Sequence, residues 1–240
     1  MHPVRNVRFW LVTLAAVAGI ALTATLARWQ MDRAAQKLAL QAAIEERRAL
    51  PPADAAMLVA GGPELVHRPV VLRGTWSGQH TIFLDNRQMK GRPGFYVLTP
   101  LRLKGSNRAV VVQRGWAPRD FMAREQLPRI ETPGGVVELR GRIAPAPSKL
   151  YEFGAAELGP IRQNLDLGAF SAQTGLPLLP LSVQQTGGPS EGLLRDWPQA
   201  ATGVEKHYGY AFQWGGLSGL IAVLYVWFQL IAPRRRPHAS

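Results

Sequence analysis

The sequence contains no cysteine among its 240 residues. This absence excludes a disulfide scaffold, a thiolate zinc site, a cysteine-held iron–sulfur cluster and a cysteine nucleophile. A metal bound by this chain therefore needs nitrogen or oxygen ligands, or the sulfur of methionine. Acidic residues are also few, with 16 Asp and Glu against 28 Lys and Arg, so the formal net charge is +12. The hydrophobic share of 47% excludes a disordered chain.

Charge is missing altogether from two long segments. Residues 9–27 contain no charged side chain, and residues 210–232 contain only Gln213 and Gln229 as strongly polar residues. A hydrocarbon core of roughly 30 Å is crossed by about 20 helical residues. The sequence therefore predicts transmembrane helices at residues 9–27 and 208–232, with the lipid bilayer as a partner.

The basic residues that flank these segments predict the topology. Arg5 and Arg8 precede the first segment, and Arg234, Arg235 and Arg236 follow the second. By the positive-inside rule, the tails at residues 1–8 and 233–240 are cytoplasmic, and residues 28–207 form an outer domain. The first segment begins too early to leave room for a mitochondrial transit peptide, so we expect a bacterial inner membrane and a periplasmic domain.

Two alternatives concern the same features. A signal peptidase could cleave after the small residues 16–18, but cleavage there would expose a new apolar terminus. The positive charge could indicate nucleic-acid binding, but the basic residues between the two segments are spread evenly and do not cluster with aromatic residues. We therefore expect an uncleaved first helix and no nucleic-acid partner.

The region between the segments predicts an α+β domain. An Ala-, Leu- and Arg-rich run at 28–50 favours a helical stalk that Pro51 and Pro52 end. A short helix capped by Asp54 follows, and further helices are expected at 119–127 and at 167–174, the last capped by Asp166. We expect turns at 85–86, 105–107 and 133–135, in a mainly antiparallel sheet or small open barrel. Its predicted strands are residues 67–76, 80–86, 94–103, 109–116, 135–143 and 179–187.

Several motifs favour structural interpretations. Residues 188–192 fit the G-x-S-x-G pattern of a hydrolase, but Ser190 stands in a turn-forming run without the strand and helix that a nucleophile elbow needs. His67 and His80 lack neighbouring carboxylates at metal-binding spacing. Small residues recur four apart in both apolar segments, which predicts that the two helices pack as an antiparallel hairpin. These residues are Ala15, Gly19 and Thr23 in the first segment and Gly215 and Gly219 in the second.

A histidine at the start of the second segment is the candidate functional residue. At helical spacing, His207 shares one face with Tyr210, Ala211 and Trp214. An imidazole above two aromatic rings could hold the iron of a haem that lies against this face. The alternative is an interfacial belt in which these residues only anchor the helix at the headgroup level.

The antiparallel hairpin adds arginines to this candidate site. The end of the first segment would lie level with the start of the second, which places Arg28, Trp29, Gln30 and Arg33 at the depth of His207. A guanidinium can pair with a haem propionate through two hydrogen bonds. The alternative is that Arg28 and Arg33 are ordinary charges that flank a membrane helix.

Ordered motifs along nearly the whole chain resemble the surfeit locus protein 1 family of membrane factors for cytochrome c oxidase assembly. The resemblance rests on Trp29-Gln30 with Arg33 and Lys37, Asp85-Asn86-Arg87, Gly91, Pro93-Gly94-Phe95-Tyr96, Thr99-Pro100-Leu101, Gln113-Arg114-Gly115-Trp116-Ala117-Pro118, His207, Gly209-Tyr210-Ala211 and Gln213-Trp214. The chain departs from the family pattern at Ala27, Gln113 and Gly215, and the last departure thins the aromatic wall beside the candidate site.

The resemblance implies a non-catalytic role in delivering haem a to oxidase subunit I or inserting it there. By this resemblance, His207 is the axial ligand of the haem iron, while we expect Tyr210 and Trp214 to flank the ring and Arg28 or Arg33 to pair with the propionates. The expected partners of the periplasmic domain are the oxidase or the haem a synthase. Two alternatives are a scaffold for an oxidase intermediate that binds no haem, and an envelope enzyme that uses Ser190.

Overall fold

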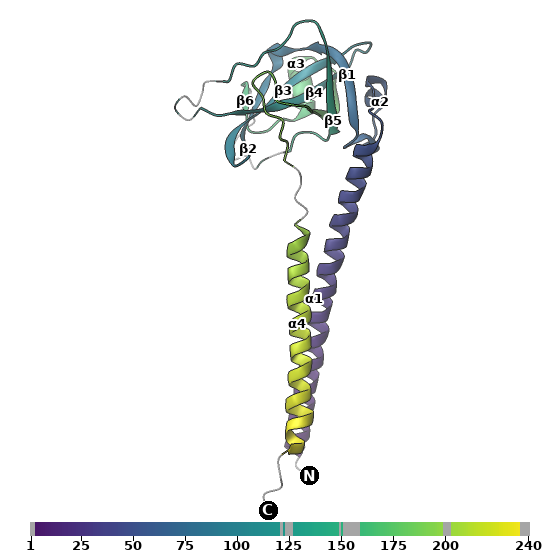
Figure 1. The fold of residues 1–240 in the computed structure, drawn as a ribbon, viewed down its shortest axis with the longest axis vertical. Coiled ribbons are helices and arrows are strands. Elements are labelled where there is room, and N and C mark those ends of the chain that lie inside the picture. The colour runs from purple at the N-terminus through teal and green to yellow at the C-terminus, as the bar shows by residue number, and fades with distance from the viewer. Residues whose placement is uncertain are drawn as a thin grey trace, which may run out of the picture. The chain divides into compact units, whose positions relative to one another are not determined.

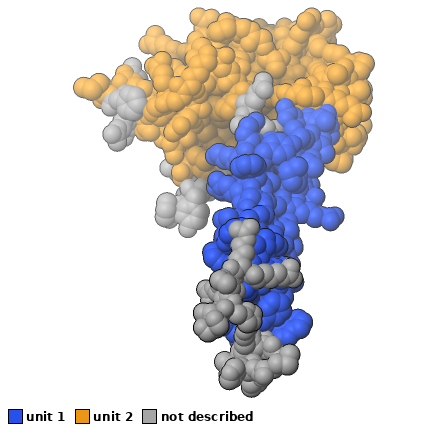
Figure 2. Space-filling model, turned by 60° about the horizontal axis from the view of Figure 1, so that its bottom comes forward, with its two compact units in different colours: residues 1–43, 200–240 blue, residues 44–199 orange. Residues whose placement is uncertain are grey.

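The chain forms two compact units in a computed structural model, which describes residues 3–120, 122, 127–148, 150, 159–198 and 203–235. The first unit consists of residues 1–43 and 200–240, and the second of residues 44–199 (Figure 2). The first unit is helical, and the second contains the sheet (Figure 1). The polar stalk and the sheet predicted between the apolar segments are thus both present.

Two long helices form the first unit. Helix α1 runs without a break from Pro3 to Ala49, which confirms that the first apolar segment continues into a helical stalk. Helix α4 spans Val204–Tyr225 and continues as a π-helical stretch, Val226–Ile231, and a short 3₁₀ turn, Ala232–Arg235. By length and composition, residues 7–49 and 204–231 are helices able to cross a membrane. The basic tail expected at 233–240 lies outside the described residues from residue 236 onward.

Short helices in the second unit begin where their capping residues predict. Helix α2, Ala55–Ala60, starts after Asp54, whose carboxylate accepts a hydrogen bond from the Met57 amide, and it ends at Gly61. Helix α3, Leu167–Thr174, starts after Asp166, which accepts from the Ala169 amide. Each carboxylate satisfies an amide that the first turn of a helix leaves unpaired. Further 3₁₀ turns span Pro63–Leu65 and Gly78–His80.

The sheet closes into a ring. Its order is β1-β5-β7-β4-β3-β2-β6, and an additional pairing of β1 with β3 joins five of these strands in a small barrel. Strand β3 is long enough to pair with β2 in its first half and with β1 at its end. The strands are β1 Pro69–Trp76, β2 Ile82–Met89, β3 Arg92–Leu103, β4 Ala109–Pro118, β5 Val136–Ala144, β6 Ile161–Arg162 and β7 Leu178–Gln185.

The sheet is mixed: most of its pairs are antiparallel, as the sequence predicted, and two are parallel. Strand β7 pairs parallel to β4, and the two-residue strand β6 pairs parallel to β2. A parallel pair needs a crossover connection, and helix α3 lies within the long connection that leads from β4 to β7. Hydrophobic alternation identifies a strand but not its direction, so the sequence did not reveal which pairs are parallel.

Two local predictions also need correction or fall outside the described chain. The turn expected at residues 85–86 is wrong, because β2 runs through Asp85 and Asn86 as a bulge between Leu84 and Arg87. Asn86 takes a left-handed conformation there (φ 57°), which asparagine tolerates. The hairpin turn instead lies at Lys90 and Gly91. The helix expected at 119–127 falls largely on residues outside the described set.

Apolar side chains fill the ring and pack on its outside. The interior cluster comes from all five ring strands and is joined by Leu58 of α2. A second cluster packs Phe170 of α3 against Leu98 and Val111 of the sheet. The alternating inward residues of β1, Val70 and Leu72, are fully buried, as the period of a strand requires.

Candidate functional site

Helices α1 and α4 pack antiparallel, as the sequence predicts. Three side-chain contacts join them in opposite order along the two helices. The Tyr225 hydroxyl lies 2.9 Å from the Thr13 hydroxyl, the Ser218 hydroxyl donates to the carbonyl of Ile20 at 3.4 Å, and His207 Nδ1 lies 2.7 Å from Gln30 Oε1. The start of α4 is therefore level with the part of α1 that directly follows the first apolar segment.

The contact face of α4 is a continuous stripe. Residues shielded from solvent recur every three or four positions on this helix, the spacing of one helix face. They are Val204, His207, Ala211, Trp214, Ser218, Ile221 and Tyr225. His207 thus lies on the side of α4 that faces α1.

Of the small residues expected to bring the two helices together, only some of those on α1 lie at the contact. A Cβ added at Gly19 would lie 3.4 Å from Ile221, and Thr23 is buried, whereas Ala15 is exposed. A Cβ added at Gly215 or Gly219 would meet no atom within 4 Å. The predicted role of these two glycines in the hairpin is wrong, because they lie on a different face of α4 from the stripe.

The imidazole of His207 has one fixed nitrogen and one free nitrogen. An amide oxygen can only accept, so Nδ1 donates its hydrogen to Gln30 Oε1 across the 2.7 Å contact. In the tautomer that has its hydrogen on Nδ1, the lone pair is on Nε2, for which the described residues offer no hydrogen-bond partner. A histidine whose second nitrogen donates to a carbonyl is the usual arrangement of a metal ligand. The geometry therefore fits an axial ligand of haem iron.

The aromatic residues around His207 are arranged less uniformly than the sequence suggested. Trp214 lies on the contact stripe with His207, while Tyr210 is half exposed beside it. Trp29 is exposed to a similar degree on α1. A Cβ added at Gly209 or Gly215 would meet no atom within 4 Å. Of the two aromatic residues predicted beside His207, Trp214 thus shares the contact stripe of His207 and Tyr210 faces outward.

The two arginines predicted for the site are exposed on α1. Arg33 donates from Nη1 to Gln36 Oε1 at 3.3 Å, and its guanidinium lies 5.6 Å from the ring centroid of Trp29. Arg28 lies two residues before Gln30, the residue that holds His207. Both guanidiniums are exposed on α1. A spacing of three residues places Arg33 on the same helix face as Gln30, whereas a spacing of two places Arg28 on a different face.

The sequence motif at 113–118 has a structural role in the second unit. The Arg114 side chain is fully buried, contacts Glu191 Oε2 at 2.9 Å and lies over the ring of Trp76 at 4.8 Å. Trp116 is buried and donates from its indole to the carbonyl of Arg87 at 2.9 Å. A Cβ at Gly115 would lie 2.7 Å from Leu193. These residues hold strand β4 against the loop that follows β7.

The motif at 85–87 and the serine at 190 are structural as well. Asp85 accepts two hydrogen bonds from Arg119, and Arg87 donates to the carbonyls of Ser148 and Gln163. The Ser190 hydroxyl accepts from Arg195 at 2.8 Å within a loop, as predicted. No strand–turn–helix surrounds Ser190 in the described part of the chain, so it lacks the setting of a hydrolase nucleophile.

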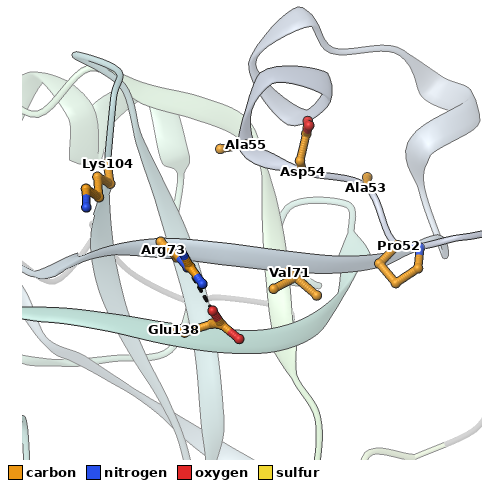
Figure 3. Close-up of a pocket in the computed structure, with 8 residues that line it drawn as sticks. All are labelled: Pro52, Ala53, Asp54, Ala55, Val71, Arg73, Lys104 and Glu138. Atoms are coloured by element: carbon orange, nitrogen blue, oxygen red, sulfur yellow. Dashed lines mark hydrogen bonds and ion pairs between the residues drawn. The ribbon is translucent and has the colours of Figure 1, made fainter.

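An open cavity of about 520 Å³ lies beside the start of α2 and is shown in Figure 3. Its lining includes the exposed ion pair Arg73–Glu138, with 2.8 Å between Nε and Oε2. None of the lining residues carries an imidazole or thioether that could bind iron. They are Pro52, Ala53, Asp54, Ala55, Val71, Arg73, Lys104 and Glu138. Among the described residues there is also no group of three metal-binding side chains.

Sequence reasoning singled out His207 but missed its contact with Gln30. The expected hairpin placed Gln30 at the depth of His207, but the sequence offered no reason to pair the two residues, because glutamines are common beside membrane segments. The contact could have been predicted from the register of the hairpin, because that register pairs the polar residue after the first segment with the polar residue before the second. That register depends on contacts that are distant in the sequence.

Comparisons with known proteins identify a family for the sequence. The model of the SURF1 family matches residues 17–219. Human Surfeit locus protein 1 is 28% identical to the chain in an alignment of 228 residues that covers 85% of this chain and 72% of the human protein. The family match includes the sheet unit together with Gln30 and His207.

Proposed function

Because the chain belongs to the SURF1 family, whose members generally serve cytochrome c oxidase assembly, we propose that it binds haem a and assists its delivery to oxidase subunit I or its insertion there. The observation that carries this proposal is the contact between His207 and Gln30. It leaves Nε2 of His207 free to bind iron while Nδ1 is held. The haem would be cargo to be passed on, so the protein acts as an assembly factor and not as an enzyme.

The same proposal places the paired helices in a bacterial inner membrane. Their outward side chains support this, since Trp10, Phe212 and Phe228 are each more than 60% exposed in a pair of helices with apolar outer faces. Both tails would be cytoplasmic and the sheet unit periplasmic, following the basic residues at the two ends. His207 would then lie at the outer boundary of the bilayer.

At that boundary each neighbouring residue has a defined task. Tyr210 and Trp214 provide apolar surface beside the imidazole, and the exposed guanidinium of Arg28 or Arg33 pairs with a propionate. Water is available to the charged groups, while the apolar helix faces accommodate the ring. The sheet unit would contact subunit I or the haem a synthase.

The experiment compares the protein with its His207→Ala variant, each purified in detergent from cells that make haem a. We expect the unchanged protein to carry the visible absorbance of haem a and the variant to lose it. The matched control is His80→Ala, which removes an imidazole from the sheet unit and should leave the absorbance unchanged. Full retention of haem by the His207→Ala protein would contradict the proposed ligand.

The scaffold alternative is an outcome of the same experiment. Colourless unchanged protein that nevertheless restores oxidase to a strain lacking it would support a scaffold and overturn haem binding. Loss of oxidase in the His207→Ala strain, with a normal amount of the variant protein in the membrane, would support haem transfer.

A further inference from the structure

A cluster of positive side chains lies where the end of α1 meets the sheet of the second unit. We define this basic cluster as Arg47, Arg48, His67 and Arg142. The two arginines of α1 are in its last turn, His67 stands shortly before β1, and Arg142 belongs to β5. All four side chains are partly accessible to solvent. None of these four residues belongs to the candidate site around His207.

The positive charges of the basic cluster are poorly balanced. Among the residues that the structure describes, one carboxylate pairs with the cluster: Glu45 contacts Arg48 at 2.6 Å and also raises the pKa of Arg142, and its own side chain is 56% exposed. Burial lowers the pKa of His67, and the guanidiniums of Arg142, Arg48 and Arg47 lower it further. Burial and the charge of Arg48 also lower the pKa of Arg142. The cluster therefore holds several like charges close together, which is unfavourable unless an anion joins them.

Arg142 is held in place by a chain of hydrogen bonds that enters the sheet. Its Nη2 donates to Gln184 Oε1 at 2.7 Å, and Gln184 Nε2 donates to Gln113 Oε1 at 3.3 Å. Gln113 Nε2 donates to the hydroxyl of Ser182 at 2.8 Å, which in turn donates to the carbonyl of Pro145 at 2.6 Å. Gln113 and Ser182 are buried. A surface guanidinium anchored in this way has lost much of its freedom before any ligand binds, as a preorganised binding group does.

Backbone and side-chain details of the cluster point the same way. His67 has a left-handed backbone (φ 78°), an unfavourable conformation that is fixed by the hydrogen bond from its amide to the carbonyl of Ile143 at 2.8 Å. Arg48 has a buried Nε for which the described residues provide no hydrogen-bond acceptor.

We propose that the basic cluster is a docking site for an acidic segment of a partner protein, whose carboxylates bind Arg47, Arg48 and Arg142. Carboxylates match the planar fork of a guanidinium, and several of them on one segment can engage several arginines together. Along α1, Arg47 follows Ala27, the end of the apolar run, by 20 residues, or about 30 Å of helix. A headgroup layer is only several ångströms deep, so the phosphates of lipids are the weaker explanation.

The test measures binding of a fluorescein-labelled hexaglutamate peptide to the full-length protein in detergent, by fluorescence anisotropy at low salt. We expect saturable binding that weakens as salt is added, and about tenfold weaker binding for Arg142→Gln. The matched control is Arg92→Gln, which removes the same charge from the exposed first residue of β3 and should change the affinity less than twofold. A labelled hexaglutamine peptide should not bind.

A second variant keeps the proposal testable if Arg142→Gln disturbs the sheet. The double substitution Arg47→Gln and Arg48→Gln changes only the last turn of α1 and should also weaken peptide binding tenfold or more. Equal affinity of these variants and of Arg92→Gln would overturn the proposal, since the peptide would then report the net charge alone. Inorganic phosphate, phosphatidylglycerol vesicles and unlabelled hexaglutamate are then compared, per charge, as competitors of the labelled peptide. If phosphate or the vesicles compete as strongly as hexaglutamate, the cluster binds another anion and the proposal is overturned.

Discussion

Replacing Gln30 by leucine tests whether the contact between the two helices prepares His207 for iron. The substitution removes the acceptor that lies 2.7 Å from Nδ1 and leaves the helix and its apolar packing in place. Loss of such a partner usually lowers metal affinity by about 10- to 100-fold, which corresponds to roughly 1.4–2.7 kcal/mol. The ring is then free to rotate and to place its hydrogen on Nε2, the nitrogen needed for the iron.

The assay is a titration of detergent-solubilised apoprotein with haem a, followed by the change in haem absorbance. We expect weaker binding by Gln30→Leu and binding close to that of the unchanged protein by Gln30→Glu, since a carboxylate accepts the same hydrogen bond. Gln41→Leu, a change at an exposed glutamine of the stalk, is the matched control and should bind normally. Equal affinities of Gln30→Leu and Gln41→Leu would refute the role of Gln30 in orienting the imidazole.

Three further predictions concern the sheet unit and are measured by denaturant unfolding. Arg114→Met should lower the free energy of unfolding by about 3 kcal/mol, the lower end for a broken buried ion pair, because the carboxylate partner keeps a second guanidinium at 3.3 Å; a change below 1 kcal/mol would contradict this. Gly115→Ala should cost about 1–3 kcal/mol because its Cβ would lie 2.7 Å from two atoms, whereas Gly134→Ala meets open space and should be nearly neutral; similar losses in both would exclude the proposed crowding. The lowered pKa of His67 means that the unfolded chain takes up a proton first, so stability should fall as the pH drops below about 6.5, and a pH profile unchanged in His67→Asn would argue against it.

The helices of this protein were predictable because their signals are local. Asp54 and Asp166 each cap the helix that follows, and the run after Ala27 contains no residue that ends a helix before Pro51. The strands were found from their alternation, except for β6, whose two residues are too few to show any period. Strand direction and the bulge at Asn86 escaped prediction, because both depend on partners far away in the sequence.

The candidate site was predictable as a set of residues and not as a geometry. His207 was found from its position at the start of an apolar segment, and the expected hairpin placed Gln30 at the same depth. The small residues Gly215 and Gly219 were assigned to the wrong face, since a spacing of four indicates a shared face without saying which neighbour the face meets. The motif around Arg114 is the opposite case: it is part of the family resemblance, but its fully buried arginine holds the loop after β7 on strand β4.

The most direct test of the central proposal is detection of the bond between iron and His207. Resonance Raman spectra of the purified protein with bound ferrous haem should contain an iron–nitrogen stretching band that shifts to lower frequency when histidine is labelled with nitrogen-15. The band should disappear in His207→Gly and return, without the isotope shift, when unlabelled imidazole is added. A haem spectrum that shows no histidine-dependent shift, or one that is identical in His207→Gly, would contradict the account.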